Sequence, residues 1–154
     1  GAGFDLCNMC DIRLGCPETL LGETFINLGI IPGDGGAWFL QRVAGYQRAA
    51  ELSLTGRLVT ADEALEYGIL MELVGTDALL PRAQELAAQI ARMPQQCMRS
   101  DRASAYEQWS LDSVDALKNE FRRGMDVVTG SEMRQGVKNF MQGAGRHGST
   151  LGEK

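Results

Sequence analysis

A glycine-rich turn opens the chain and has the composition of an oxyanion-binding site. Gly1 and Gly3 flank Ala2, and they predict a tight turn at the head of a short helix over residues 1–9. N–H groups at a helix N-terminus point toward a ligand, and the helix dipole favours negative charge there. Fixed backbone donors of this kind stabilise the negative oxygen of an enolate or a tetrahedral thioester intermediate. The alternative interpretation is a plain tight turn.

Two acidic residues could take part in chemistry: Asp5 lies beside this turn, and Asp34 lies before a later helix. Asp5 follows Ala2 by three residues, so on a helix its carboxylate projects from about the face that presents the Ala2 amide. A carboxylate there can transfer protons, although Asp also simply stabilises the first turn of a helix. Asp34 precedes a helix expected over residues 37–43, and we interpret it first as the N-cap of that helix.

The elements that must position these residues alternate in the first half of the chain. Strands are expected over residues 11–14, 20–22 and 69–74, and helices over 37–43, 46–54, 60–68 and 77–92. Thr60 and Glu63 have the spacing of a capping box. After Pro94 no strand-like run remains, and two helices are expected, over 113–128 and 131–141. The organisation predicted is an α/β core over residues 1–76, a helical region over 77–141, and a disordered tail over 142–154.

Composition narrows the function classes. The chain has 154 residues, 44% of them hydrophobic and 23% charged, which suits one globular core with an appendage. A net charge of −5, with Lys and Arg scattered, disfavours a nucleic-acid partner. No apolar run reaches the ~18 residues of a membrane helix, and no signal-peptide pattern opens the chain. We therefore expect no membrane partner and a cytoplasmic location.

The cysteines do not predict a metal site. Cys7 and Cys10 form a C-x-x-C pair, which suits a redox pair or half of a zinc site. No second pair follows, however, and the single histidine, His147, is distant in the sequence. We expect Cys7 and Cys10 to be small apolar residues facing a core, with reduced thiols and no metal.

Four blocks of residues, taken in their order, resemble the crotonase superfamily of enoyl-CoA hydratases, isomerases and related enzymes. The blocks are Gly1-Ala2-Gly3-Phe4-Asp5-Leu6, Asp11-Ile12-Arg13, Leu28-Gly29-Ile30-Ile31-Pro32-Gly33-Asp34-Gly35-Gly36 and Leu54-Thr55-Gly56-Arg57. The resemblance implies an α/β fold, namely the C-terminal half of a crotonase-like ββα spiral core followed by a helical trimerisation region. It also implies an acyl-CoA substrate, a trimeric or hexameric homo-oligomer, and no cofactor beyond the coenzyme A of the substrate. In relatives the first oxyanion donor precedes the position that matches Gly1. The 154-residue chain alone is therefore expected to be a poor catalyst.

The resemblance also assigns roles within the site. The Ala2 amide matches the second oxyanion donor, and Gly1 and Gly3 would let the ligand approach it. Asp5 matches one of two catalytic glutamates of the hydratases. The position of the second holds Phe25, which is expected to make that wall of the acyl pocket apolar. Glu23 lies two residues earlier and is the candidate replacement, since residues two apart share a face of an extended segment.

Three further expectations concern single residues, and those for Asp34 and Arg146 follow from the resemblance. Asp34 lies one residue from a position that some family members use as a nucleophile or base, Trp38 is expected to line the acyl pocket, and Arg146 falls near a basic segment beside the CoA adenine. The leading hypothesis is an enoyl-CoA hydratase-like lyase of fatty acid metabolism. The alternatives are a non-catalytic acyl-CoA-binding or assembly subunit, and another reaction of the family such as thioester hydrolysis.

Overall fold

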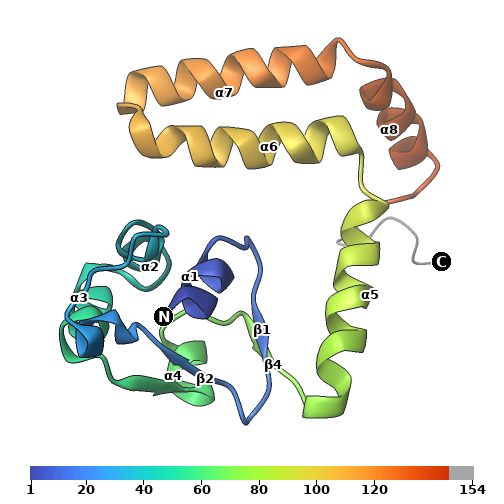
Figure 1. Ribbon diagram of the computed structural model, residues 1–154. Coiled ribbons are helices and arrows are strands. Elements are labelled where there is room, and N and C mark those ends of the chain that lie inside the picture. The colour runs from blue at the N-terminus through green and yellow to red at the C-terminus, as the bar shows by residue number, and fades with distance from the viewer. Residues whose placement is uncertain (146–154) are drawn as a thin grey trace. The chain divides into compact units, whose positions relative to one another are not determined.

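The computed structural model describes residues 1–145, which divide into two compact units (Figure 1). The first unit is Gly1–Glu85, and the second begins at Leu86. The boundary between the units falls within the helix over Leu79–Ala91. The sequence predicted an earlier boundary, after residue 76, just past the last expected strand.

The first unit mixes short strands with helices. In chain order its elements are α1 (Ala2–Asn8), β1 (Leu14–Gly15), β2 (Leu20–Gly22), the 3-10 helix η1 (Thr24–Leu28), α2 (Gly36–Ala44), α3 (Tyr46–Thr55), β3 (Leu58–Thr60), α4 (Ala61–Glu66), β4 (Glu72–Leu73), the 3-10 helix η2 (Thr76–Ala78) and the start of α5 (Leu79–Ala91). The strands are shorter than expected over residues 11–14 and 69–74. Strand β3 was not predicted at all, because three residues carry too little periodicity.

The strands pair across long stretches of sequence in two small sheets. Strands β1 and β4 are parallel, with Leu14 opposite Glu72. Strands β2 and β3 are antiparallel, with Leu20 opposite Thr60 and Gly22 opposite Leu58. Because β2 is held in this ladder, the residue that follows it, Glu23, has a fixed position. The second sheet thereby determines where one of the expected site residues lies.

The core of the first unit lies between the helices and these strands. Its buried members are Phe4, Leu40, Ala44, Ala49, Leu52, Val59, Ala64, Ile69 and Leu70. They come from α1 to α4, from β3 and from the segment before β4, so burial of apolar surface joins elements far apart in sequence. Phe4 belongs to this core and precedes Asp5 directly, which draws the Asp5 backbone into the interior.

The predicted capping box of α4 is confirmed. The Thr60 hydroxyl accepts a hydrogen bond from the Glu63 N–H at 3.4 Å, and the Glu63 carboxylate accepts one from the Thr60 N–H at 3.0 Å. Arg57 extends this network: its guanidinium contacts Glu63 at 2.9 Å and Glu51 at 2.7 Å. The pKa of Arg57 is raised, chiefly by its hydrogen bond to Glu51. Together these contacts join α3, β3 and α4.

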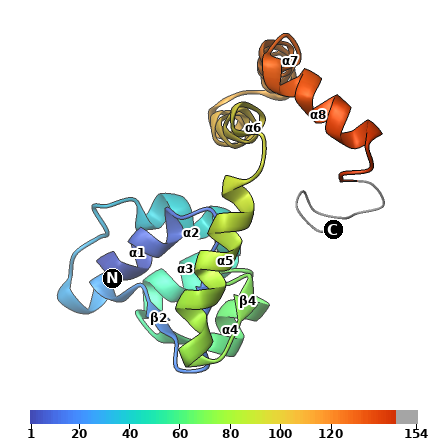
Figure 2. The ribbon, with the colours of Figure 1, turned by 90° about the vertical axis from the view of Figure 1, so that its right-hand side faces the viewer.

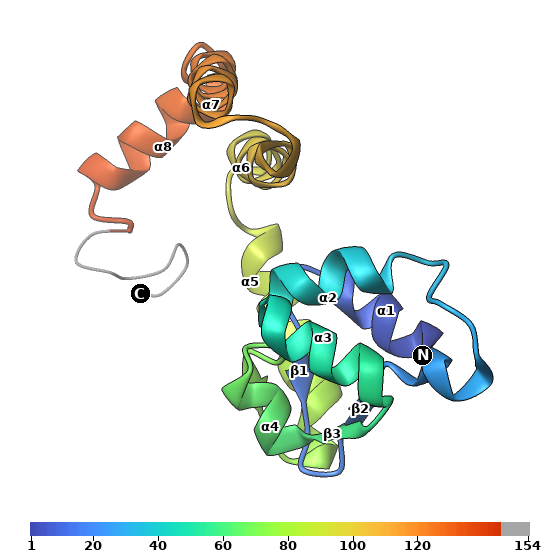
Figure 3. The same ribbon diagram turned by 90° about the vertical axis from the view of Figure 1, so that its left-hand side faces the viewer.

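The second unit is helical. It contains the end of α5, α6 (Gln95–Glu107), the 3-10 helix η3 (Gln108–Ser110), α7 (Ser113–Val128) and α8 (Ser131–Met141). Helices α6 and α7 lie side by side, as Figures 2 and 3 show nearly end-on. The helices over 113–128 and 131–141 are confirmed, whereas α6 was not expected. Its sequence lacks a continuous apolar stripe, and packing against α7 supplies what local pattern does not.

An ionic contact joins α6 to α7. The Glu107 carboxylate accepts hydrogen bonds from Arg123 Nε at 2.8 Å and from the Asn119 amide at 2.7 Å. These donors, Arg123 foremost, lower the pKa of Glu107 to about 2. This pKa lies below the value that Glu107 has in the unfolded chain. The contact therefore stabilises the α6–α7 pair at pH values above the usual pKa range of glutamate, and this stabilisation is lost as the pH falls toward 2.

Two expectations concern parts of the chain beyond these elements. No helix within residues 1–145 combines the length and apolar character needed to span a bilayer. Of the tail expected over 142–154, the structure describes only residues 142–145, and Gln142 there is the C-cap of α8. The rest, with Arg146 and His147, lies outside the described residues.

Candidate active site

Two carboxylates predicted from the sequence meet inside the first unit. Asp5 lies on α1, and Glu23 lies between β2 and η1. The Gly1 amino group donates a hydrogen bond to the Gly22 carbonyl, so the start of α1 is attached to the end of β2. Asp5 is 0% exposed and Glu23 1% exposed. Fully buried carboxyl groups are rare in proteins unless they are paired, which makes this pair the most unusual feature of the core.

The surroundings of the pair lack hydrogen-bond donors. No group in the described part of the chain donates to the carboxyl oxygens of Asp5 or Glu23. The neighbours of the Asp5 carboxyl are two other carboxyl groups, those of Asp34 and Glu23. Neighbouring carboxylates repel one another, and burial disfavours the charged form of each. The arrangement therefore favours a protonated member.

The proton resides on Asp5 at neutral pH. Burial, above all, together with the adjacent carboxyl groups of Asp34 and Glu23, raises the pKa of Asp5 from 3.8 to about 8. At pH 7 Asp5 is thus mostly a neutral acid that can donate a hydrogen bond or a proton. Carboxyl groups held in different protonation states side by side are the usual arrangement for acid–base chemistry.

The start of α2 closes over the Asp5 carboxyl. A Cβ atom at Gly36 would lie 2.5 Å from Asp5 Oδ1, so no side chain fits there. Gly35, which precedes it, has φ 97° and is the N-cap of α2, and no side chain caps this helix. The expected role of Asp34 as the N-cap is therefore wrong, because the helix begins one residue later than an Asp34 cap requires. The Asp34 carboxyl instead lies near enough to Asp5 to raise the pKa of that group.

The glycine turn forms the first turn of α1 beside this cluster. The Gly1 carbonyl accepts hydrogen bonds from the N–H groups of Phe4 at 2.7 Å and Asp5 at 3.2 Å. Ala2 is the first residue of α1, where a helix leaves its N–H groups without intrahelical acceptors. Ala2 and Gly3 are exposed, and a Cβ atom at Gly3 would meet no atom within 4 Å. A ligand can therefore approach the backbone of this turn.

Phe25 and Trp38, the two aromatic residues expected to line an acyl pocket, lie in different elements and differ in exposure. Phe25 is half-buried within η1, and its carbonyl accepts a hydrogen bond from Ile30 N–H at 3.4 Å. The carboxylate beside Asp5 comes from Glu23, not from the Phe25 position. Trp38 is 47% exposed, and the Arg42 guanidinium lies 3.3 Å from the centre of its ring. Contact of either aromatic ring with an acyl chain stays a prediction.

The structure also shows one residue that the sequence interpretation missed, and it corrects another expectation. Asn8 is 2% exposed, and its side-chain amide finds no partner among the described residues. It lies three residues after Asp5 on the same face of α1, a spacing that would have revealed it. Because Phe4, Asp5 and Asn8 form the buried face of α1, Cys7 and Cys10 are exposed, so their expected core-facing orientation is wrong. All four cysteines are free, and residues 1–145 contain no cluster suited to a metal ion.

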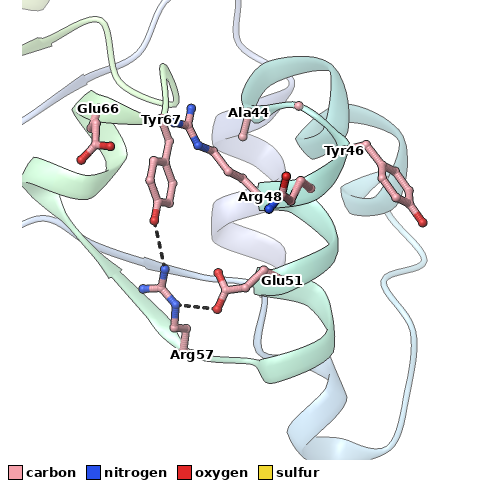
Figure 4. A pocket seen from close by; sticks show the side chains of 9 residues that line it. Ala44, Tyr46, Arg48, Glu51, Arg57, Glu66 and Tyr67 are labelled. Carbon is pink, nitrogen blue, oxygen red and sulfur yellow. Dashed lines mark hydrogen bonds and ion pairs between the residues drawn. The ribbon is translucent and has the colours of Figure 1, made fainter.

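An open pocket of about 710 Å³ lies away from this cluster, between the start of α3 and the end of α4 (Figure 4). Its cationic groups are already engaged. The Arg48 guanidinium lies 4.4 Å from the centre of the Tyr67 ring, and Arg57 binds Glu51 and donates to the Tyr67 hydroxyl at 3.3 Å. The pocket contains no unpartnered buried acid comparable to Asp5. We therefore place the candidate active site at the Asp5–Glu23 pair.

Comparison with known proteins identifies the class to which this fold and site belong. The sequence model of the enoyl-CoA hydratase/isomerase family matches residues 1–144. The crystal structure of an enoyl-CoA hydratase from Bacillus anthracis superimposes with a TM-score of 0.89 at 32% identity, covering 92% of this chain and 55% of that one. The protein belongs to the enoyl-CoA hydratase/isomerase family and has its α/β crotonase fold, which confirms the family and the fold expected from the sequence.

Particular relatives agree with this assignment. The chain is 37% identical over 141 residues to a short-chain-enoyl-CoA hydratase from Clostridioides difficile, covering 90% of this chain and 89% of the relative. It is 30% identical over 143 residues to a crotonyl-CoA hydratase from Syntrophomonas wolfei, covering 92% of this chain and 55% of the relative. The chain spans about half the length of the first curated relatives it matches, and the Syntrophomonas wolfei protein is one of these.

Proposed function

We propose that the protein is an enoyl-CoA hydratase-like lyase that adds water across the double bond of a 2-enoyl-CoA thioester. The observation that carries this proposal is the buried Asp5–Glu23 pair, in which the pKa of Asp5 is raised to about 8 and no amide, hydroxyl or cationic group among the described residues donates to either carboxyl group. Hydration needs a group that takes a proton from water and a group that gives one to carbon. Family membership supports an acyl-CoA thioester as the substrate class, with coenzyme A as part of the substrate.

In this mechanism a backbone N–H group stabilises the developing negative charge, and two carboxyl groups transfer protons. The Ala2 N–H hydrogen-bonds to the thioester oxygen, where negative charge develops as the enolate forms. Glu23 accepts a proton from the water whose oxygen attacks the β-carbon, and Asp5 supplies a proton to the α-carbon. The C–O and C–H bonds form as the double bond is lost, and the two carboxyl groups exchange protons to return to their starting states. Glu23 thereby replaces the carboxylate that the Phe25 position lacks.

The test of this function is saturation with crotonyl-CoA. We expect hydration, followed as loss of the absorbance of the conjugated enoyl thioester, in a form of the protein extended before Gly1 by the N-terminal half of its longer relatives. The 154-residue chain should be much slower, because losing one of two oxyanion donors costs on the order of 10²–10³-fold in turnover. Tight binding of crotonyl-CoA without turnover in the extended form would instead identify a non-catalytic acyl-CoA-binding subunit. Release of free thiol would identify a thioester hydrolase.

We further propose that α7 contributes to a homo-oligomer, as a trimer or hexamer. Val114, Leu117, Phe121 and Val128 are exposed and recur at helical spacing, so they form one apolar stripe. Leu117, Phe121 and Val128 also line a hollow of about 580 Å³ between α6 and α7. Unpartnered apolar surface of this kind typically marks a protein interface. A cytoplasmic location remains a prediction from composition.

Charge on this stripe should dissociate the oligomer. We expect Phe121→Lys to shift the sedimentation coefficient toward that of a monomer, because burying an unpaired ammonium group in an apolar interface is unfavourable. Lys118→Gln is the matched control, since it changes an exposed side chain on the same helix that pairs with Asp115 instead. Equal sedimentation of the Phe121→Lys variant and the unchanged protein, at concentrations where the latter is oligomeric, would place the interface elsewhere.

A further inference from the structure

The buried pair has a third carboxyl neighbour that the hydration mechanism above does not use. Asp5 and Glu23 are fully buried, whereas Asp34 is exposed in the loop before α2. Asp34 precedes Gly36 by two residues, and the Gly36 backbone lies so close to the Asp5 carboxyl that a Cβ atom would be 2.5 Å from Oδ1 and 2.6 Å from Oδ2. The loop therefore brings an exposed carboxyl group to a buried one, and Asp34 is not needed as a helix cap.

We propose that Asp34 is the solvent-facing member of a three-carboxyl cluster and passes the proton of Asp5 to and from water. The step moves one proton: the Asp5 O–H transfers it to the Asp34 carboxylate, and the resulting Asp34 acid releases it to solvent, leaving Asp5 ionised. The reverse sequence reprotonates Asp5. Asp34 is thus a proton-exchange residue and acts on the reaction only through Asp5.

Burial explains why such a route is useful. Asp5 has no contact with solvent and no donor other than its carboxyl neighbours, so direct transfer to bulk water is obstructed. Glu23 is equally buried and cannot provide the exit. Among the described residues, the carboxyl groups that act on Asp5 are those of Glu23, from the segment after β2, and Asp34, from the loop before α2. Both raise the pKa of Asp5, so removing the charge of either should lower it.

The inference rests on the proposed function, in which Asp5 acts as an acid, but its test needs no substrate. The test is carbon NMR of the 154-residue chain with labelled aspartate carboxyl groups, titrated across the pH range around 8. In the unchanged protein we expect one Asp5 signal that moves continuously, because exchange through Asp34 is fast. In Asp34→Asn, which removes the charge and the relay but keeps the shape, two results are expected. The Asp5 midpoint should fall by about one pH unit or more, and near the midpoint the signal should broaden or split into protonated and ionised forms.

Controls separate this role from a structural one. Asp34→Glu should retain a single averaged signal, and Asp77→Asn, at an exposed position in η2, should leave the Asp5 titration unchanged. Asp34→Ala serves as a second neutral variant if Asp34→Asn loses the dispersed amide spectrum of the folded chain. A single averaged Asp5 signal with an unmoved midpoint in the neutral variants would overturn the proposal. This result would leave the crotonyl-CoA assay unaffected, and failure of that assay would leave the titration unaffected.

Discussion

Glu23→Gln is expected to lower the turnover number for crotonyl-CoA by about 10²–10⁴-fold, the usual contribution of a positioned acid–base group. Glutamine preserves the size of the side chain at a site that is 1% exposed, so packing is kept while the proton acceptor is lost. The KM should change little, because the missing group acts on the transition state and not on the CoA moiety. The measurement is steady-state hydration by the form extended with the N-terminal half of the longer relatives.

A matched substitution makes this expectation specific. Glu66→Gln changes an exposed glutamate at the end of α4 and should leave both kinetic parameters near their original values. If Glu23→Gln retained nearly full turnover, Glu23 would not be the second carboxylate of the mechanism. Phe25 offers the complementary check: Phe25→Glu should restore little activity to Glu23→Gln if the water site lies where Glu23 now points.

Local sequence patterns predicted those features that depend on local geometry. The capping box of Thr60 and Glu63 needs only three residues between a hydroxyl and a carboxylate, so its spacing was sufficient to identify it. The helix of the second unit over residues 113–128 likewise follows from its apolar periodicity. The family and the fold class could also be predicted, because the order of several blocks along the chain is more specific than any one of them.

The geometry of the site depended on tertiary structure and could not be predicted from the sequence. Glu23 meets Asp5 because β2 pairs with β3, far along the chain, and because the start of α1 is attached to Gly22. Asp34 lies near Asp5 in the loop before α2, where Gly35 has a left-handed backbone and is the N-cap of the helix. A Gly-Gly sequence indicates that such a turn is possible but does not indicate which carboxyl group lies beneath it.

Asp5→Asn is expected to stabilise the chain while it impairs turnover. In the folded protein the pKa of Asp5 is about 8, against 3.8 ordinarily, so between these pH values the folded state binds a proton that the unfolded state does not. The free energy of unfolding of the original protein therefore falls as the pH rises from about 4 to about 8, and is flat above that. Each unit of pKa shift corresponds to about 1.4 kcal/mol, so the whole effect is on the order of several kcal/mol.

The same linkage gives the direction in which the stability difference between Asp5→Asn and the original protein changes with pH. Asparagine does not titrate and its amide can donate to Glu23, so the stability of Asp5→Asn relative to the original protein should increase from pH 4 to pH 8 and then level off. Urea unfolding at a series of pH values measures it, with Asp77→Asn as the exposed control that should show no such trend. A pH-independent difference would mean that Asp5 ionises normally in the folded chain. The expected outcome, a gain in stability at the cost of activity, is what a buried acid retained for catalysis should show.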